Sequence, residues 1–195
     1  MKRLYTFFIA AALCLSANAA TPIKVVNGVS QELAVSRAAI VSNITYDLTF
    51  NIPASKTEAV KGNATITFIY KGGKTDLQLD FQGAPSQFDG LCVVNGKQIA
   101  VAWQDEHILI PRKSLRRGKN IISMSFISGD KSLNRNADYL YTLFVPEHAR
   151  SVFPCFDQPD LKALFRTCLN VPEGWETITS VSTERIPTYL FSFVA

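Results

Sequence analysis

The segment from Ile44 to Ile52 constrains the fold of this chain most. Apolar side chains occupy every second position there, and Thr, Asp or Asn side chains occupy the positions between them. A period of two over nine residues is typical of a β-strand with one buried face. The same alternation recurs in residues 64–70 and, in shorter form, in residues 77–81. These patterns predict a core built from sheets.

Turn signals divide the rest of the chain into further short strands. Asn95-Gly96 separates two apolar runs and predicts a hairpin, because both residue types tolerate a positive φ. Short strands separated by turns every 8 to 12 residues or so indicate an all-β fold, a twisted antiparallel β-sandwich or saddle. One short N-terminal helix is expected over residues 30–39, with Ser30 as its N-cap. The other expected strands are residues 92–94, 99–101, 107–110 (stopped by Pro111), 122–126, 140–145, 164–171 and 189–194.

The first residues predict a targeting segment. Lys2-Arg3 is followed by an apolar run over residues 4–15 and then by Ala17-Asn18-Ala19, a small-x-small cleavage site. Residues 1–19 are therefore expected to be a signal peptide, and residues 20–195 a single exported domain, periplasmic or extracellular. The apolar run is shorter than a bilayer requires, and no later run is longer. We expect no membrane partner after signal cleavage.

Charge and cysteine usage exclude few functions but limit the partners. Without Lys2 and Arg3 the chain has 18 basic and 16 acidic residues, which gives no electrostatic reason to expect a nucleic-acid partner. The basic run at residues 112–117 is interpreted as a solvated turn. Three cysteines remain after processing, Cys92, Cys155 and Cys168. An odd number argues against full pairing, and a bridge between Cys155 and Cys168 or buried free thiols both remain open.

The C-terminal segment 189–195 is apolar and aromatic up to its last residue. Because domains usually end in polar, frayed tails, we expect that the chain was cut from a longer protein or ends against a partner. An inner strand that happens to lie at the terminus is the alternative.

Residues 149–165 form the most distinctive motif. Pro154 and Pro159 fix φ on either side of a polar turn, Phe153 and Phe156 can anchor it, and Asp157 can accept backbone N–H bonds. This run resembles the signature A-R-x-x-F-P-C-F-D-E-P-x-x-K-A-x-F of the aminopeptidase N family of zinc metallopeptidases. Eleven positions match in order, namely Ala149, Arg150, Phe153, Pro154, Cys155, Phe156, Asp157, Pro159, Lys162, Ala163 and Phe165. Gln158 stands where many relatives have Glu.

Weaker similarities extend the resemblance over roughly residues 40–195. Residues 44–48 resemble the family's first-strand Y-D-L, residues 118–120 its G-x-N turn, and residues 187–193 its S-T-Y-L-F-A-F strand. The resemblance implies a non-catalytic N-terminal β-domain of an exported zinc aminopeptidase that removes N-terminal residues from peptides. It also implies a partner, a thermolysin-like catalytic domain, in cis or in trans.

Two departures from the family pattern affect what the resemblance implies. Relatives commonly read T-Q-F-E-P upstream of the motif, where the Gln and Glu reach into the active site and the second of them helps to hold the substrate's amino group. Here Leu143 and Val145 stand at those positions, and neither side chain can hydrogen-bond an ammonium. The resemblance makes them substrate-pocket positions; plain strand residues are the alternative. The stretch between Thr179 and Thr183 is also shorter than in the family, which suggests an internal deletion.

The residues for the family's chemistry are absent from this sequence. Zinc binding in this family needs H-E-x-x-H, but the two histidines, His107 and His148, are 41 positions apart and neither precedes Glu. The family's Gly-x-Met-Glu-Asn strand is also missing. We therefore expect no catalytic or metal-binding residue and no cofactor in this chain, with zinc only in a separate catalytic domain. The alternatives are a stand-alone exported β-sandwich binding module or an inactive relic of a disrupted gene.

Overall fold

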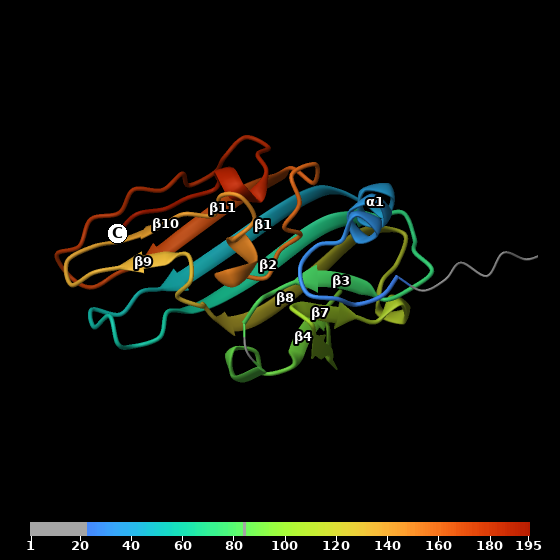
Figure 1. The fold of residues 1–195 in the computed structure, drawn as a ribbon, viewed down its shortest axis with the longest axis horizontal. Helices are drawn as coiled ribbons and strands as arrows, with labels where there is room; N and C mark the ends of the chain where they lie inside the picture. The colour runs from blue at the N-terminus through green and yellow to red at the C-terminus, as the bar shows by residue number, and fades with distance from the viewer. Residues whose placement is uncertain (1–22, 84) are drawn as a thin grey trace, which may run out of the picture.

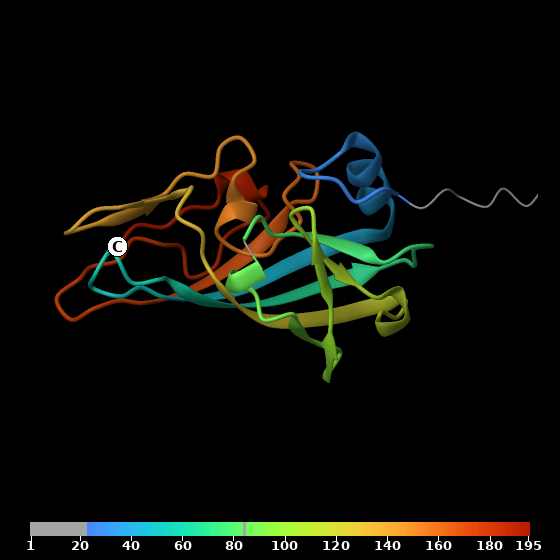
Figure 2. The same ribbon diagram turned by 60° about the horizontal axis from the view of Figure 1, so that its bottom comes forward.

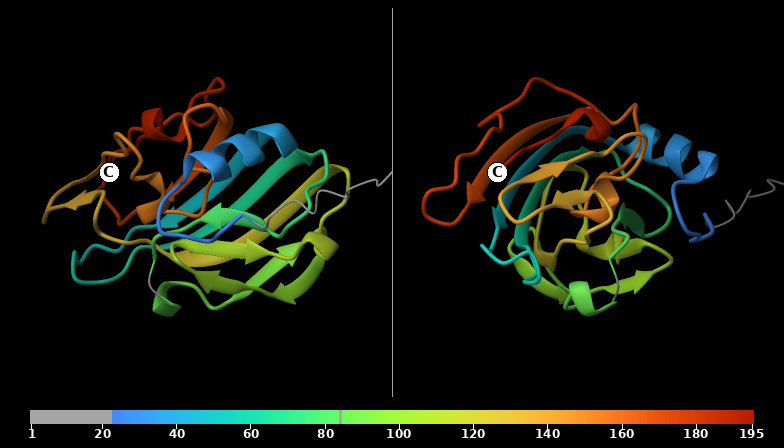
Figure 3. Two further views of the ribbon diagram at one scale, coloured as in Figure 1. Left: turned by 45° about the vertical axis from the view of Figure 1, so that its right-hand side comes forward. Right: turned by 60° about the vertical axis from the view of Figure 1, so that its left-hand side comes forward.

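The computed structural model describes residues 23–83 and 85–195. The expected signal peptide, residues 1–19, lies outside these residues. Within them the chain forms a large curved sheet, and α1, Gln31–Ile40, lies with the segments that follow β10 on one side of it (Figures 1 and 2). The right-hand view of Figure 3 shows the sheet curling around the orange segment that follows β10. The observed architecture confirms an all-β, sandwich-like domain with one short helix.

Six strands form the large sheet, and the period-two pattern explains which face each side chain takes. The strand order is β11-β1-β2-β8-β4-β5. In β1 the side chains of Ile44, Tyr46, Leu48 and Phe50 are buried, while the Thr and Asp side chains between them are partly exposed. The bounds are β1 Val41–Asn51, β2 Lys61–Tyr70, β4 Leu91–Val94, β5 Lys97–Ala100, β8 Gly118–Ile127 and β11 Ala163–Asn170.

The sheet is not antiparallel throughout. β1 pairs with β11 in parallel, in a continuous register from Ile44↔Ala163 to Asn51↔Asn170. The other strand pairs of the large sheet are antiparallel. A parallel pair needs a long crossover connection. Here the crossover between β1 and β11 contains most of the chain. The motif residues, which immediately precede β11, therefore return to the large sheet beside β1.

Two smaller sheets complete the fold of the described residues. One has the order β3-β7-β6, with β3 Leu77–Asp80, β6 Ala102–Gln104 and β7 His107–Ile110; the other pairs β9, Leu133–Arg135, with β10, Leu140–Thr142. Short 3₁₀ turns connect these elements at Pro85–Gln87, Arg112–Ser114, Ala149–Ser151 and Thr188–Leu190. No helix within the described ranges combines the length and the apolar character needed to cross a membrane.

The local signals identified in the sequence act as expected. Ser30 caps α1, because its hydroxyl accepts the Leu33 N–H at 3.1 Å. Asn95 and Gly96 have φ values of 52° and 84°, which give the β4–β5 hairpin its tight turn. A second two-residue hairpin joins β6 to β7 through Asp105 and Glu106, both with positive φ. The sequence does not signal this hairpin, because its two turn residues do not include the usual Gly.

The prediction of a strand over residues 189–194 was wrong. Thr188–Leu190 is a 3₁₀ turn, and the extended residues that follow pair only at isolated bridges, with Val194 facing both Tyr141 and Ile178. Burial of Phe191, Phe193 and Ala195 produces the alternating pattern without a full ladder. The strand predicted over residues 140–145 is also shorter, since β10 ends at Thr142 and the Leu143 N–H donates to Ser132 O instead.

Residues 183–186, which follow the stretch where a deletion is expected, are integrated into the fold. Thr183 N–H donates to Phe165 O at 2.9 Å, and the Thr183 hydroxyl accepts the Phe165 N–H at 3.0 Å. Ile186 exchanges two backbone hydrogen bonds with Ala163. The segment therefore covers the outer edge of β11, where an unpaired strand would otherwise be exposed.

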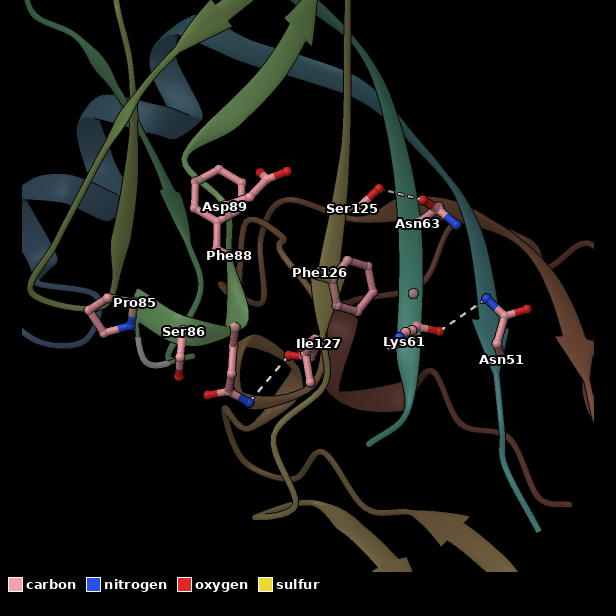
Figure 4. Close-up of a pocket in the computed structure, with 12 residues that line it drawn as sticks. Asn51, Lys61, Asn63, Pro85, Ser86, Phe88, Asp89, Ser125, Phe126 and Ile127 are labelled. Carbon is pink, nitrogen blue, oxygen red and sulfur yellow. Dashed lines mark hydrogen bonds between the residues drawn. The ribbon is translucent and has the colours of Figure 1, made fainter. Parts of the chain in front are cut away.

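A glycine is required at position 62 in β2, because the Phe126 ring approaches its backbone closely. Gly62 lies opposite Phe126 on the buried face, and a Cβ added to Gly62 would lie 2.4 Å from Phe126 Cζ. Figure 4 shows this ring between β8 and β2. Gly62→Ala is therefore expected to lower the free energy of unfolding by about 1–3 kcal/mol, as overpacking does. Urea unfolding checks this, and Gly62→Ala combined with Phe126→Leu should recover part of the loss. Additive losses in the double variant would contradict the steric explanation.

Candidate functional site

The motif at residues 149–165 lies largely inside the molecule. Residues 149–158 are all buried, while Pro159 and Lys162 are exposed. Cys155 exchanges backbone hydrogen bonds with Asp80, at 2.8 and 3.0 Å, so the motif extends the small sheet beyond β3. The Arg150 carbonyl accepts the Gln82 N–H at 2.8 Å. The motif thus forms a second layer, tied by its backbone to the small sheet.

Phe153 is the centre of the aromatic core. Its ring lies 5.7–6.4 Å from five other rings, each at an interplanar angle between 72° and 90°. Such edge-to-face pairs are favourable beyond the area they bury. Phe156 anchors the next turn, because its N–H donates to the buried Tyr46 hydroxyl at 2.8 Å. Burial of that hydroxyl raises the pKa of Tyr46 well above its usual value. The five rings belong to Tyr46, Phe50, Phe144, Phe165 and Phe191.

Asp157 accepts hydrogen bonds as the sequence suggested. One carboxylate oxygen accepts the Arg150 N–H at 3.1 Å, and the other accepts the Thr188 hydroxyl at 2.6 Å. Burial raises the pKa of the Asp157 carboxyl, and these two hydrogen bonds offset only part of that effect. Asp157 therefore joins the start of the motif to the turn at Thr188.

A buried ionic cluster lies beside the motif. Arg37 from α1 donates to Asp80 Oδ1 at 2.6 Å, and His107 Nε2 lies 3.1 Å from the same oxygen. Asp80 Oδ2 accepts the Asp157 N–H at 2.7 Å. Burial raises the pKa of Asp80, but the Arg37 charge and the contact with His107 outweigh it and hold that pKa below its ordinary range. None of these three side chains was recognised from the sequence as part of a site.

Gln158 connects this cluster to the helix. Its side-chain oxygen accepts the Arg37 Nε–H at 2.7 Å, and its amide nitrogen donates to Ala34 O at 3.1 Å. A glutamate at this position could accept from Arg37 but could not donate to a carbonyl. Gln158 is therefore the residue type that satisfies both partners.

Arg150 holds the N-terminal segment through acidic neighbours. Its guanidinium donates to Glu147 O at 2.9 Å and lies 3.4 Å from Glu106, which also accepts the Gly28 N–H at 3.1 Å. Partial burial lowers the pKa of Arg150, but hydrogen bonding to Glu147 and the nearby carboxylates raise it above its usual value. This cluster also positions residues rather than presenting a reactive group.

The three cysteines are free thiols in this structure. Cys92 and Cys155 are buried and Cys168 is exposed. Burial, together with the Asp89 charge, raises the pKa of Cys92 to about 12, and burial raises the pKa of Cys155 well above its usual value. Neither buried thiol has the lowered pKa of a nucleophile.

Leu143 and Val145 lie on an exposed apolar surface. Exposed and buried residues alternate through this segment, so both point outward while Phe144 is buried between them. Val194 and Ile178 are bridge partners and continue the surface sideways from Tyr141. A cavity of about 450 Å³ adjoins it at Trp175. We call this surface the apolar face; its members are Tyr139, Tyr141, Leu143, Val145, Ile178 and Val194, which are between 37% and 74% exposed.

A second cavity lies at the rim of the large sheet. It has a volume of about 450 Å³ and is lined by polar ends of β1, β2 and β8 and by the loop before β4 (Figure 4). Ser125 Oγ donates to Asn63 Oδ1 at 2.8 Å, and Asn51 donates to Lys61 O at 3.4 Å. These hydrogen bonds join lining residues to one another, and none of them pairs a nucleophile with a base.

No three His, Cys, Asp or Glu side chains gather as a metal site would require in residues 23–83 and 85–195. His107 is buried against Asp80, and His148 lies in the loop before the motif. His148 hydrogen-bonds through its backbone to Ser151, whose hydroxyl donates to His148 O rather than to the imidazole.

The fold and the site therefore define a β-domain in which a buried polar cluster locks a rigid motif and an apolar face is left exposed. Residues 127–190 match the peptidase M1 N-terminal domain family. The chain is 28% identical over 165 residues to aminopeptidase N of Streptomyces lividans, covering 79% of this chain and 19% of that protein. It is 38% identical over 85 residues to a probable M1 family aminopeptidase of Encephalitozoon cuniculi, covering 38% of this chain and 9% of that protein.

Solved structures agree on the fold. The M1 zinc metallopeptidase of Deinococcus radiodurans superposes with a TM-score of 0.62 at 18% identity, over 80% of this chain and 42% of that chain. Yeast LTA4 hydrolase gives a TM-score of 0.62 at 18% identity, over 82% of this chain and 29% of that one. The chain resembles the N-terminal β-domain of the M1 aminopeptidase family. It spans about a fifth or less of the length of the curated relatives it matches.

The two buried carboxyls of the site give the free energy of unfolding opposite pH dependences. The folded-state pKa of Asp80 is lowered, so its contribution is present above the ordinary Asp pKa of about 3.9 and is lost as pH falls through the folded value. The folded-state pKa of Asp157 is raised, so its contribution is complete below about 3.9 and is lost as pH rises through the folded value. Urea unfolding at several pH values should show a shallower acid-side loss for Asp80→Asn than for the parent chain. An unchanged acid slope would contradict this assignment.

Proposed function

We propose that this chain is the non-catalytic N-terminal domain of an exported zinc aminopeptidase. In this proposal residues 1–19 are a signal peptide, residues 20–195 are the β-domain, and the protein acts in the periplasm or outside the cell. A thermolysin-like catalytic domain, in cis or in trans, carries the zinc and removes N-terminal residues from peptides. The family match and the M1 zinc metallopeptidase neighbours support this role.

The apolar face is the observation that carries the proposal. Six apolar side chains are exposed on β10 and the residues beside it, on the segment of Val194 bridged to Tyr141, and on the segment of Ile178 bridged to Val194. Contiguous exposed apolar surface on a soluble domain marks an interaction site. The rigid motif supports this surface from behind, since Phe144, between Leu143 and Val145, packs 5.7 Å from Phe153. We propose that the catalytic domain packs against this face.

Leu143 and Val145 would then lie at the mouth of the active site. Both are apolar and more than half exposed. In this proposal they form an apolar wall near the first substrate pocket and leave recognition of the substrate's amino group to the catalytic domain. The domain's contribution is to shape the opening and restrict it to short peptides.

A photo-crosslinker tests the packing. Benzoylphenylalanine at position 143 should crosslink to a polypeptide that contains H-E-x-x-H when the experiment is done in extracts of the source organism. Mass spectrometry of the crosslinked product identifies that sequence. The result is expected whether the H-E-x-x-H polypeptide is continuous with this chain or separate from it. The same probe at the exposed Val93, on the large sheet, is the control and should not reach that polypeptide. Crosslinks from position 143 only to proteins without H-E-x-x-H would contradict the proposal and favour a stand-alone binding module.

A further inference from the structure

Basic residues from three separate parts of the chain meet at one end of the molecule. The sequence shows the run Arg112 to Arg117 as an isolated turn, but Tyr70 pairs with Gly118, and this places the loop after β2 beside it. Arg117 lies against Gly72, and Arg112 donates to Gly73 O at 3.4 Å. Figure 2 shows both loops at the same end of the sheet. We call this surface the basic end; its members, all exposed, are Lys71, Lys74, Lys97, Arg112, Lys113, Arg116, Arg117 and Lys119.

The charge of the basic end is not neutralised locally. It contains eight of the 18 basic residues in the described ranges but, of the 16 acidic residues, only Asp76. Asp76 accepts the backbone N–H of Arg112 at 2.9 Å, and none of the eight cationic groups forms an ion pair within the described part of the chain. The other described residues therefore carry an excess of negative charge. The molecule is polarised although its net charge is small.

Two side-chain amides hold the basic loop in one conformation. Asn120 is fully buried; its side chain donates to Arg116 O at 2.7 Å and to Gly118 O at 3.0 Å and accepts the Arg116 N–H at 3.0 Å. Asn95 donates to the same Asn120 oxygen at 2.8 Å and to Ser114 O at 3.2 Å. The charges are thus presented from a preorganised loop, which lowers the entropic cost of binding.

A cleft opens within the basic end. It has a volume of about 710 Å³ and lies between the β4–β5 hairpin and the loop after β7. Lys97 and the apolar Ile99 line it from the hairpin, and Lys113 and the apolar Pro111 line it from the loop after β7. A lining of lysines and apolar residues together matches an amphiphilic anion, whose headgroup meets the charges while its chain covers the apolar surface.

We propose that the basic end is a docking surface for a membrane rich in anionic phospholipid. Lysines and arginines near such a surface are attracted to its headgroups, and the excess negative charge elsewhere orients the basic end toward it. A nucleic acid fits less well, because none of the eight residues or the residues lining the cleft is aromatic and could stack on bases. This peripheral contact revises the expectation that the processed chain has no membrane partner. It does not depend on the proposed aminopeptidase role.

Vesicle cosedimentation of the full chain tests the docking. The chain should bind vesicles of phosphatidylcholine mixed with phosphatidylglycerol, and should bind phosphatidylcholine alone only weakly. Raising salt from about 0.1 to 1 M should release it, because the screening length falls from about 10 to 3 Å. Lys97→Gln with Lys113→Gln should lower the partition coefficient about 25-fold, since each basic residue contributes about five-fold.

The matched control removes two charges elsewhere. Lys56→Gln with Lys131→Gln changes the net charge equally at two exposed positions outside the basic end, and should change the partition coefficient less than two-fold or so. Equal losses from both pairs would show unlocalised attraction and overturn the proposal. It would also be overturned if the chain ignored anionic vesicles, or if it bound a DNA duplex more tightly than vesicles at the same salt. Amide hydrogen exchange confirms that the variants remain folded.

Discussion

Replacing Asp80 by asparagine is expected to lower the free energy of unfolding by about 3–5 kcal/mol, the cost of leaving a buried charge without its partner. Asp80 is completely buried, and its carboxylate is the only anion that contacts the equally buried Arg37 in the described ranges. The neutral amide would leave the guanidinium uncompensated. It would also turn an N–H donor toward the Asp157 N–H, or toward Arg37. Chemical denaturation with circular dichroism measures the loss.

Asp47→Asn is the matched control for this prediction. Asp47 pairs with Arg166 at 3.4 Å across β1 and β11, but both side chains are substantially exposed. Exposed ion pairs contribute only about 0–1 kcal/mol, so this variant should remain close to the parent chain. Equal effects of Asp80→Asn and Asp47→Asn would show that the buried cluster does not hold the motif in place.

Truncating Phe153 to alanine is expected to cost about 3–5 kcal/mol. The side chain is fully buried and touches rings contributed by β1, β11 and two other segments. Its removal would leave a cavity among aromatic side chains that cannot close without moving the sheet. Thermal and urea unfolding should both report the loss.

Leu143→Ala provides the comparison for Phe153→Ala. Leu143 is 57% exposed, so its truncation should change the free energy of unfolding by about 0.5 kcal/mol or less. A large loss for Leu143→Ala would mean that this residue belongs to the core rather than to the apolar face. A small loss for Phe153→Ala would show that the motif is not an anchor.

Strands with one buried face were predictable, because alternate side chains of such a strand face the core and apolar residues therefore recur at every second position. β1, β2 and β7 begin and end within a few residues of the predicted bounds for that reason. The same reasoning failed at residues 189–194, where alternating burial of Phe191 and Phe193 accompanies only isolated bridges. Alternation reports which side chains are buried and does not report how many hydrogen bonds the backbone makes. It also gave no sign that β11 would pair with β1 in parallel.

The motif was recognisable because eleven positions match in order, but the cluster that holds it was not. Arg37 and Asp80 are 43 residues apart and lie on different elements, so their pairing depends on the tertiary fold. The alternation over residues 77–81 instead predicts Asp80 on the exposed side of its strand, whereas all four residues of β3 are buried. The basic end was missed for the same reason, since it unites segments that are distant along the chain.

Hydrolysis of aminoacyl reporter substrates by the full chain, with and without added zinc, tests most directly the claim that this is a domain without its own catalytic centre. The claim rests on the absence of H-E-x-x-H and on His107 being buried against Asp80. We predict no turnover above buffer at any zinc concentration. Zinc-dependent turnover that copurifies with the chain and disappears in His148→Ala would contradict it.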